Sequence, residues 1–419
     1  MTTDNGPRTT DNDRLLMKYL PILSELTDLE IIDAARATGE PEWLIERRAE
    51  AWRFFAESTP PFWKRTDLSK FSSEDIAAPL GVQGTAIQWD AKVASQGVVF
   101  TTLAAALRSH PELVEQYLGT AVAPLTHKFT ALHAALWQDG AFLYVPQNVQ
   151  IEVPLHAIFT LADGGRATFP HNLIVVERGA SVTFIEEYTS LDIDGQALAA
   201  PTTELFVGDD ASVRFVTAQV WGENVYHIGA QRARVGNNAS LEWVALNLGS
   251  QVQHIEAETS LEGAGSNVQW VAATLCEGTQ NLLTAPWLRH AGANTEGHME
   301  FKTVVKDTGY AVFDGMIVIE KNSRGTISRL EEHALHLSPK ARNDSIPGLM
   351  IDTNDVQRAG HASTSGQIDD EQLFYMQSRG IKRDEAIHMI VTGFFEPVLD
   401  RIRLEELRDR VSAVIESKI

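Results

Sequence analysis

Two stretches of this chain decide its fold: Val176-Glu-Arg-Gly-Ala-Ser-Val-Thr-Phe-Ile185 and Val207-Gly-Asp-Asp-Ala-Ser-Val-Arg-Phe-Val216. Each has an apolar residue, a polar turn and a small residue, followed by an alternating run that predicts a strand. The unit returns at Val235–Val244 and, more loosely, at Leu261–Val271, and an earlier copy spans Val145–Val153. The equivalent positions, separated by 31, 31, 28 and 27 residues, are Val153, Phe184, Phe215, Trp243 and Trp270.

This period indicates stacked supersecondary units, because one unit made only of strands and turns cannot bury its apolar face alone. We therefore expect a mainly β chain with a β-helix or related β-solenoid core that begins near Ala141, where period-two alternation starts. A β-sandwich with similar turns is the alternative, since short strands with regular turns suit both folds.

Helical patterns flank this core. Apolar side chains at three and four spacing predict helices between about residues 13 and 135, with a break at Pro60 and an extended connector through Gly84. We expect an N-terminal helical region at 1–138, a β-helix core at 139–345 and a C-terminal helical region at 346–419.

The C-terminal region predicts three helices, and the strand pattern fades after Ile327. Asp369, followed three residues later by Gln372, predicts a capping box for the first helix, which Gly380 ends. The second helix is expected from Arg383 to Gly393, and the third after Pro397, with Val398 among its apolar residues.

Composition excludes several classes of protein. The 419 residues include 35 basic and 56 acidic side chains, giving a net charge of −21, which disfavours nonspecific binding to nucleic acid or anionic membranes. No apolar run approaches the ~18 residues of a membrane span, and the polar start Met1–Arg14 lacks a secretory signal. A cytoplasmic location is therefore expected. With Cys276 alone, the chain can form neither an intrachain disulfide nor a thiolate cage.

The common catalytic motifs are missing. The chain lacks a His-Glu-x-x-His pair, a Gly-x-Gly-x-x-Gly fingerprint, a phosphate-binding loop and a Gly-x-Ser-x-Gly elbow, so we expect it to bind no nucleotide itself. His333 and His336 would align their rings on a helix and, with the neighbouring Glu331 and Glu332, form a minor metal candidate, weighed against ordinary exposed histidines. Cys276 lies in a strand-like run, where a small buried hydrophobic role is expected.

The most specific stretch is Asn354–Ile381, where small residues surround His361 just before the capped helix. Such surroundings permit close backbone approach and an exposed imidazole. Taken without other information, His361 would be an ordinary loop histidine.

Here the chain resembles the SufB/SufD family of iron–sulfur cluster assembly proteins. The matching motifs are Ala359-Gly-His-Ala-Ser-Thr364, Asp370-Glu-Gln-Leu-Phe-Tyr375 and Ile390-Val-Thr-Gly-Phe394, with Asp139-Gly-Ala-Phe-Leu-Tyr-Val-Pro146 and Leu335-His-Leu-Ser-Pro-Lys-Ala341 upstream. The resemblance covers roughly residues 129–402 and is closer to SufD than to SufB.

The resemblance implies a right-handed parallel β-helix between helical regions, with C-terminal helices that dock a SufC ATPase. It makes His361 a candidate ligand for iron or a transient iron–sulfur cluster at a shared interface, where SufB would provide cysteine and acidic ligands. Many SufD proteins carry cysteine two residues before this histidine; this chain has Ala359, so a thiolate role there is absent.

The hypothesis is thus a cytoplasmic, noncatalytic scaffold subunit of a SufBCD complex. One alternative is a self-contained β-helix enzyme that processes glycans, which would need paired carboxylates in a cleft. The other is a structural homo-oligomeric solenoid, and a homodimer in place of the SufB/SufD heterodimer also stays open. The sequence leaves open the type of cluster and whether a flavin takes part.

Overall fold

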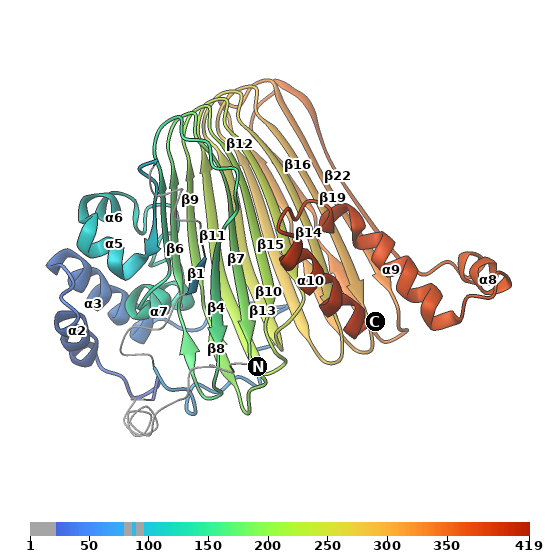
Figure 1. Ribbon diagram of the computed structural model, residues 1–419, viewed down its shortest axis with the longest axis horizontal. Coiled ribbons are helices and arrows are strands. Elements are labelled where there is room, and N and C mark those ends of the chain that lie inside the picture. Colours follow the sequence, from blue (N-terminus) through green and yellow to red (C-terminus); the bar gives the residue numbers. More distant parts are fainter. Residues whose placement is uncertain (1–21, 79–85, 89–95) are drawn as a thin grey trace, which may run out of the picture.

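The computed structural model describes residues 22–78, 86–88 and 96–419 of the chain. The expected helical turns before residue 22 and part of the expected connector, residues 79–84, lie outside these ranges. Helices gather at the N-terminal end of the molecule (Figure 1), and their bounds are α2 (Asp28–Ala37), α3 (Glu42–Glu57), α5 (Leu103–Ser109), α6 (Pro111–Tyr117) and α7 (Lys128–Leu136).

A parallel β-solenoid of about eight turns forms the centre. In the described chain, one of its two sheets has nine strands, in the order β1 (Ala86–Gln88), β4 (Leu155–Leu161), β7 (Ser181–Ser190), β10 (Ser212–Val220), β12 (Ser240–Asn247), β14 (Asn267–Cys276), β16 (Glu296–Val305), β19 (Thr326–His336) and β22 (Val356–Gln367).

The other sheet faces the first across the interior of the solenoid. Its main path is β2 (Val99–Thr102), β3 (Ala141–Val145), β6 (His171–Val176), β9 (Thr202–Val207), β11 (Val225–Val235), β13 (Val252–Leu261), β15 (Asn281–His290), β17 (Tyr310–Phe313) and β20 (Arg342–Ser345), joined by the short strands β5 (Ala167–Thr168), β8 (Ala197–Ala199), β18 (Met316–Ile319) and β21 (Gly348–Ile351).

The chain passes back and forth between the two sheets, contributing one strand to the first sheet and one or two strands to the second in each turn, and strands pair in parallel with those one turn away. The exceptions are the antiparallel pairs β1 with β4 and β2 with β3, at the N-terminal end. Parallel pairing between successive turns defines a β-helix, and the sandwich alternative is wrong because a sandwich pairs its strands in antiparallel hairpins and Greek keys.

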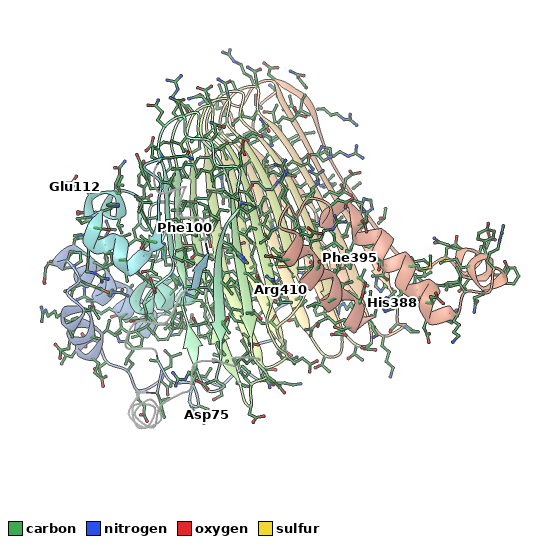
Figure 2. The ribbon with its side chains drawn as sticks, in the orientation of Figure 1. Asp75, Phe100, Glu112, His388, Phe395 and Arg410 are labelled. Carbon is green, nitrogen blue, oxygen red and sulfur yellow. The ribbon has the colours of Figure 1, made fainter. Side chains whose placement is uncertain are left out.

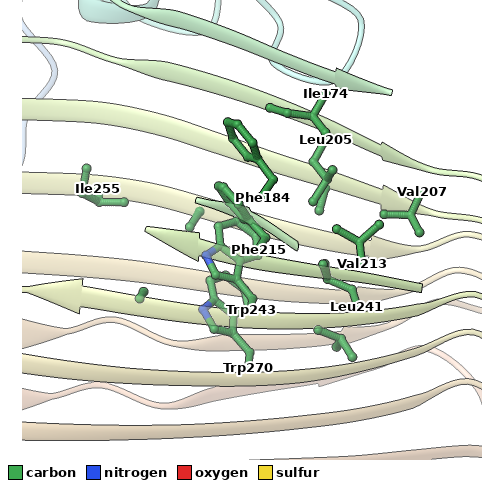
Figure 3. Packing of buried hydrophobic residues seen from close by; sticks show 14 of the residues in the cluster. Ile174, Phe184, Leu205, Val207, Val213, Phe215, Leu241, Trp243, Ile255 and Trp270 are labelled. Atoms are coloured by element: carbon green, nitrogen blue, oxygen red, sulfur yellow. The ribbon is translucent and has the colours of Figure 1, made fainter. Parts of the chain in front are cut away.

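The repeat found in the sequence is the inner aromatic row of the solenoid (Figure 3). Phe184, Phe215, Trp243 and Trp270 are register partners on β7, β10, β12 and β14, and each is at most 1% exposed. The rings of Trp243 and Trp270 stack with centroids 4.2 Å apart. The repeat therefore exists because every turn contributes a ring to one continuous core.

The residue expected at the first position of the row, Val153, is wrong. Leu155, not Val153, pairs with Phe184, and Val153 is 48% exposed. The preceding coil does pair Gln150 with Ser181, so the register slips by two residues before β4 begins. Pro154 lies in the slipped segment, where its missing N–H cannot join a ladder of hydrogen bonds.

Strands continue well beyond Ile327, contrary to the expected fading of the strand pattern. β19 has regular inward and outward alternation, and β20, β21 and β22 complete a last coil that ends at Gln367. The residues of β22 are small and polar and mostly exposed, so burial on both sides, which gives other strands their apolar signal, is missing here.

The C-terminal helices are α8 (Asp370–Ser378), α9 (Arg383–Leu399) and α10 (Glu405–Lys418). Asp369 caps α8 by accepting from the N–H of Glu371 at 2.9 Å, so the described hydrogen bonds do not include the expected capping box with Gln372. α9 does not stop at Gly393 but continues to Leu399 and includes Val398, so the third helix starts later than expected.

α9 and α10 lie on the outer face of the nine-stranded sheet (Figures 1 and 2). Phe395 and Val398 of α9 and Val411 of α10 are almost fully buried and share one apolar cluster with outward residues of the sheet, such as Val244 and Val271. This packing outweighs the cost of Gly393 in a helix, which is about 1 kcal/mol. α8 extends away from the solenoid at the end opposite the N-terminal helices.

Candidate functional site

The two ends of the solenoid are built differently in the described chain. β1 and β2 pair antiparallel with β4 and β3 at the N-terminal end, whereas β22 is the terminal strand of its sheet and pairs only with β19 in the described chain. From residue 361 to 367 every side chain of β22 is exposed. The last coil therefore presents an unpaired strand edge and the interior-facing side chains of an open end.

His361 lies in the middle of β22, on the strand face that looks into the open end. Its register partner on β19 is Leu330, which is fully buried in the interior cluster, and paired residues of neighbouring strands point to the same side. The expectation of a loop histidine is wrong, but the expected exposed imidazole is present. No hydrogen bond or ion pair holds the His361 ring in the described part of the chain.

A buried carboxylate lies on the same interior-facing side of β19, two residues after Leu330. Glu332 is 0% exposed, and its register partner Ser363 donates a hydrogen bond to Glu332 Oε2 at 3.0 Å. Asn343 of β20 donates to Glu332 Oε1 at 3.1 Å. Glu332 thus ties together β19, β20 and β22 and fixes the strand that carries His361.

Two buried polar atoms at this end have no hydrogen-bond partner among the described residues: Asn343 Oδ1 and Ser345 Oγ. Both residues pair with interior-facing residues of β17, Ala311 and Phe313, so both face the open end. Buried polar atoms are nearly always hydrogen-bonded in native proteins. The two atoms therefore mark this end as a surface on which further hydrogen-bonding groups fit.

The sequence offers Glu332 only as one of the two glutamates beside His333 and His336, and it singles out neither Asn343 nor Ser363 as a site residue. A signal for the first was available, because alternation from Thr326 to His336 places Glu332 on the same side as Leu330. No local pattern identified the other two, since their role depends on which strands the last coil brings together.

The candidate pair His333 and His336 does not form a metal site. Both lie on β19, where a spacing of three puts them on opposite faces, so the expected helix is wrong. His333 Nδ1 lies 2.7 Å from Thr364 Oγ1, and His336 Nε2 lies 2.9 Å from Ser365 Oγ. Each ring instead links β19 to β22 through a hydroxyl.

Cys276 is a buried interior residue, as expected. It is 0% exposed, and its thiol donates weakly to the carbonyl of Gln280 at 3.5 Å. Burial raises the pKa of Cys276 to about 12, so the side chain stays a thiol rather than a nucleophilic thiolate.

A single imidazole is the metal donor that the open end offers. The described residues contain no group of three or more His, Cys, Asp or Glu side chains placed to hold a metal ion. His361 fits iron as one neutral nitrogen ligand, and further ligands would have to come from another chain or from the cargo itself.

A concave surface with carboxylates lies elsewhere, on the outer face of the second sheet. A cavity of about 450 Å³ is lined by Trp63, Arg232, Glu256, Glu258 and Asp314, among others. Glu256 lies 3.6 Å from His127, and Glu258 lies 3.1 Å from Arg289. Burial would raise the pKa of Glu256, but hydrogen bonds and charges of His127 and His254 outweigh it and lower the pKa. Glu256 is thus ionised and poorly suited to act as a general acid.

Comparisons with known proteins agree with this geometry. Residues 159–394 match the family model described as "SUF system FeS cluster assembly, SufBD core domain", and residues 85–157 match "SufBD protein N-terminal region". The chain is 36% identical to the iron–sulfur cluster assembly protein SufD of Bacillus subtilis over 77% of this chain and 74% of that protein. It is 29% identical to an iron–sulfur cluster assembly SufBD family protein of Staphylococcus saprophyticus over 91% of this chain and 90% of the relative.

Together the two family matches cover residues 85–157 and 159–394, which include every strand of the β-solenoid apart from Ile158. The chain belongs to the SufBD family of the SUF system and has a role in iron–sulfur cluster assembly. No helix of the described residues is long and apolar enough to cross a membrane.

Proposed function

We propose that the chain is a SufD-like, noncatalytic scaffold subunit of a SufBCD complex, acting in the cytoplasm. In this proposal His361 supplies a nitrogen ligand to iron or to a nascent iron–sulfur cluster at the interface with a SufB-like subunit. The observation that carries it is the exposed imidazole beside an unpaired strand at the open end of the solenoid.

The chemistry of the imidazole suits transient binding. A neutral imidazole ligates iron but carries no charge, so it holds the metal less tightly than a thiolate and favours later release. Glu332 would act as a positioning residue, because its hydrogen bond from Ser363 fixes the strand two residues beyond His361. Thiolate ligands would come from the partner, since Cys276 is buried.

The partner surface for a SufB-like subunit is proposed at the open end. An unpaired edge such as that of β22 is suited to main-chain pairing with another strand. Met350 and Ile351 of β21 add exposed apolar area there, with 51% and 43% of their surfaces accessible. A second copy of this chain on the same surface is the alternative.

A SufC-like ATPase is proposed to dock on α8 and the start of α9. Phe374 and Tyr375 of α8 and Met389 of α9 are exposed large hydrophobic residues, with 72%, 59% and 53% of their surfaces accessible. These helices extend away from the solenoid, so a partner can reach them without contacting the open end directly (Figure 1). ATP hydrolysis would belong to that partner.

The test uses the chain purified together with SufB and SufC. His361→Ala should lower the iron and sulfide content of the reconstituted complex by at least about tenfold, the order expected when a metal site loses one of its supports. The matched control is His298→Ala, which removes an outward-facing imidazole from β16, a strand that does not pair with β22 in the described chain, and it should leave the cluster content unchanged. Undiminished cluster content in His361→Ala complexes would refute the assignment, and glycan turnover by the isolated chain would refute the scaffold role.

A further inference from the structure

Three buried polar side chains connect the N-terminal helices to the second sheet, far from the open end. His133 lies on α7, His171 on β6 and Glu204 on β9, and they are 4%, 4% and 0% exposed. They form a continuous chain of contacts. His133 Nε2 lies 3.0 Å from His171 Nδ1, and His171 Nε2 lies 3.0 Å from Glu204 Oε2.

The tautomer of the first ring is fixed by its other nitrogen. His133 Nδ1 lies 2.7 Å from the carbonyl oxygen of Ala200, which can only accept, so Nδ1 carries a proton. In the neutral ring Nε2 then accepts, and the hydrogen of the next contact belongs to His171 Nδ1. Burial and the charge of His171 lower the pKa of His133 well below its ordinary value, in keeping with a neutral ring.

The three contacts of the His133–His171–Glu204 network need one hydrogen more than two neutral imidazoles can supply. The three contacts, from Ala200 to His133, from His133 to His171 and from His171 to Glu204, each need one hydrogen. Two neutral imidazoles provide two. The third sits between His171 Nε2 and Glu204, either as an imidazolium N–H or as a carboxylic acid.

The surroundings of Glu204 decide between these forms. Its oxygens accept from the backbone N–H groups of Gly119 at 2.6 Å, Ala121 at 2.7 Å and Val122 at 2.8 Å. With His171 these donors fill the four acceptor positions of a carboxylate, which leaves no place for an acidic hydrogen. Glu204 is therefore ionised, and His171 is the buried imidazolium that pairs with it.

We propose that His133, His171 and Glu204 form a proton-dependent clasp that holds α7 and the loop 119–122 against the sheet. Without the proton, a lone pair of His171 would face the carboxylate of Glu204 in a buried place, and leaving such polar groups unpaired is costly. The clasp is closed while His171 holds this proton and opens when the proton is lost. This inference is independent of the proposed function.

Other charges around the clasp act on the same proton. Arg48 of α3 contributes a positive charge near His133, and Arg47 and Glu50 of α3 line a cavity of about 270 Å³ that both imidazoles border. Arg232 of β11 is the register neighbour of Glu204. The remaining acidic group, Asp139, accepts the backbone N–H of His171 through its carbonyl. Arg48 is itself paired with Glu40, and Arg232 lies near Glu256 and Glu258, so acidic groups offset these cations around the clasp.

Nuclear magnetic resonance of the full chain, labelled with ¹⁵N-histidine, tests the protonation directly. His171 is assigned by comparison with His171→Gln and, should that variant fail to fold, with His133→Gln, which removes the hydrogen-bond partner of the His171 signal. At pH 7 we expect both ring nitrogens of His171 to carry hydrogen, while His133 carries one. A His171 ring with a single N–H at pH 7 would overturn the proposal.

Hydrogen exchange tests the clasp itself. After correction for intrinsic rates, protection of residues 118–137 should fall by about tenfold per pH unit once the proton is lost, as expected for linkage to one proton. Residues 240–276 in the solenoid provide the internal reference and should keep their protection. His171→Gln should leave residues 118–137 poorly protected at every pH, and the control is His110→Gln, at a partly buried histidine outside the clasp. Equal changes in the two segments of the wild-type chain would contradict the clasp.

Discussion

At the scale of single residues, the interior of the solenoid contains one carboxyl group in an unusual state. Glu186 is 0% exposed, and burial raises its pKa to about 7, although it accepts hydrogen bonds from Thr203, Asn172, Thr217 and Gln231. The free-energy cost of burying a charged carboxylate therefore exceeds the stabilisation that the four hydrogen-bond donors provide. Glu186 changes its charge close to neutral pH inside the core.

This residue predicts a pH dependence of stability. A carboxyl group whose pKa is higher in the folded than in the unfolded chain binds more protons when folded, so the free energy of unfolding falls as pH rises from about 4.5 to 7. For this shift the fall is about 3 kcal/mol. Glu186→Gln cannot titrate, so urea titrations should show a smaller difference between pH 5 and pH 8 than in the wild type.

The control for Glu186→Gln is Glu223→Gln, an exposed carboxyl on a loop, which should leave the pH dependence unchanged. An identical slope in wild type and Glu186→Gln would mean that Glu186 stays ionised at pH 5 and that the hydrogen bonds dominate burial.

The candidate site illustrates what single residues reveal in a sequence. His361 was identified through the motif around it, which resembles a family pattern, and the structure places its imidazole at the exposed end of the solenoid. Glu332 and Asn343 carry no local signal of this kind. They meet only because β19, β20 and β22 form the last coil. Their contact can therefore be predicted only when the pairing register of these strands is known.

At the scale of elements, the inner aromatic row was predictable and the ends of the elements were not. Alternation at the start of β10, β12 and β14 is strong because the inward face is buried while the outward face is partly exposed; further along each strand the burial is nearly continuous. The end of α9 was missed because glycine signals a helix stop only when tertiary packing does not override it. Here Phe395 and Val398 pack on the sheet beyond Gly393.

The aromatic row predicts a large loss of stability on truncation. Trp243 is 1% exposed and lies between Phe215, with ring centroids 5.0 Å apart, and Trp270 at 4.2 Å. Trp243→Ala should lower the free energy of unfolding by about 3–5 kcal/mol, because a cavity remains in a row fixed on both sides. Urea titration of the purified chain measures the loss.

Two further variants serve as controls for Trp243→Ala. Trp243→Phe keeps a ring in the row and removes a buried indole N–H that has no partner in the described residues, so it should cost less than alanine. Leu191→Ala, at a side chain that is 58% exposed, should change stability by less than about 0.5 kcal/mol. Equal losses for Trp243→Ala and Leu191→Ala would mean that the row contributes nothing specific.

At the scale of the whole molecule, the two proposed partner surfaces lie on different structural units. We propose the last coil of the solenoid as the surface for a SufB-like partner, and α8 with the start of α9, which extend away from the solenoid (Figure 1), as the surface for a SufC-like partner. Hydrogen bonds and ion pairs anchor α10 to the sheet. Arg410 bonds to Glu187 at 2.6 Å, and Lys418 bonds to Glu277 at 2.6 Å. The sheet thus carries both surfaces as one rigid support.

This arrangement predicts that the two associations can be lost separately. Met350→Asp with Ile351→Asp places charges on the exposed apolar area beside β22, and should abolish copurification with SufB while retaining SufC. Phe374→Asp with Met389→Asp should do the reverse, because buried charges without partners are strongly unfavourable at an interface. Leu29→Asp, at a residue of α2 that is 67% exposed, is the matched control and should retain both partners. Loss of both partners in either double variant, with the fold intact by circular dichroism, would show that the two surfaces are coupled and that the end of the solenoid and the C-terminal helices act as one interface.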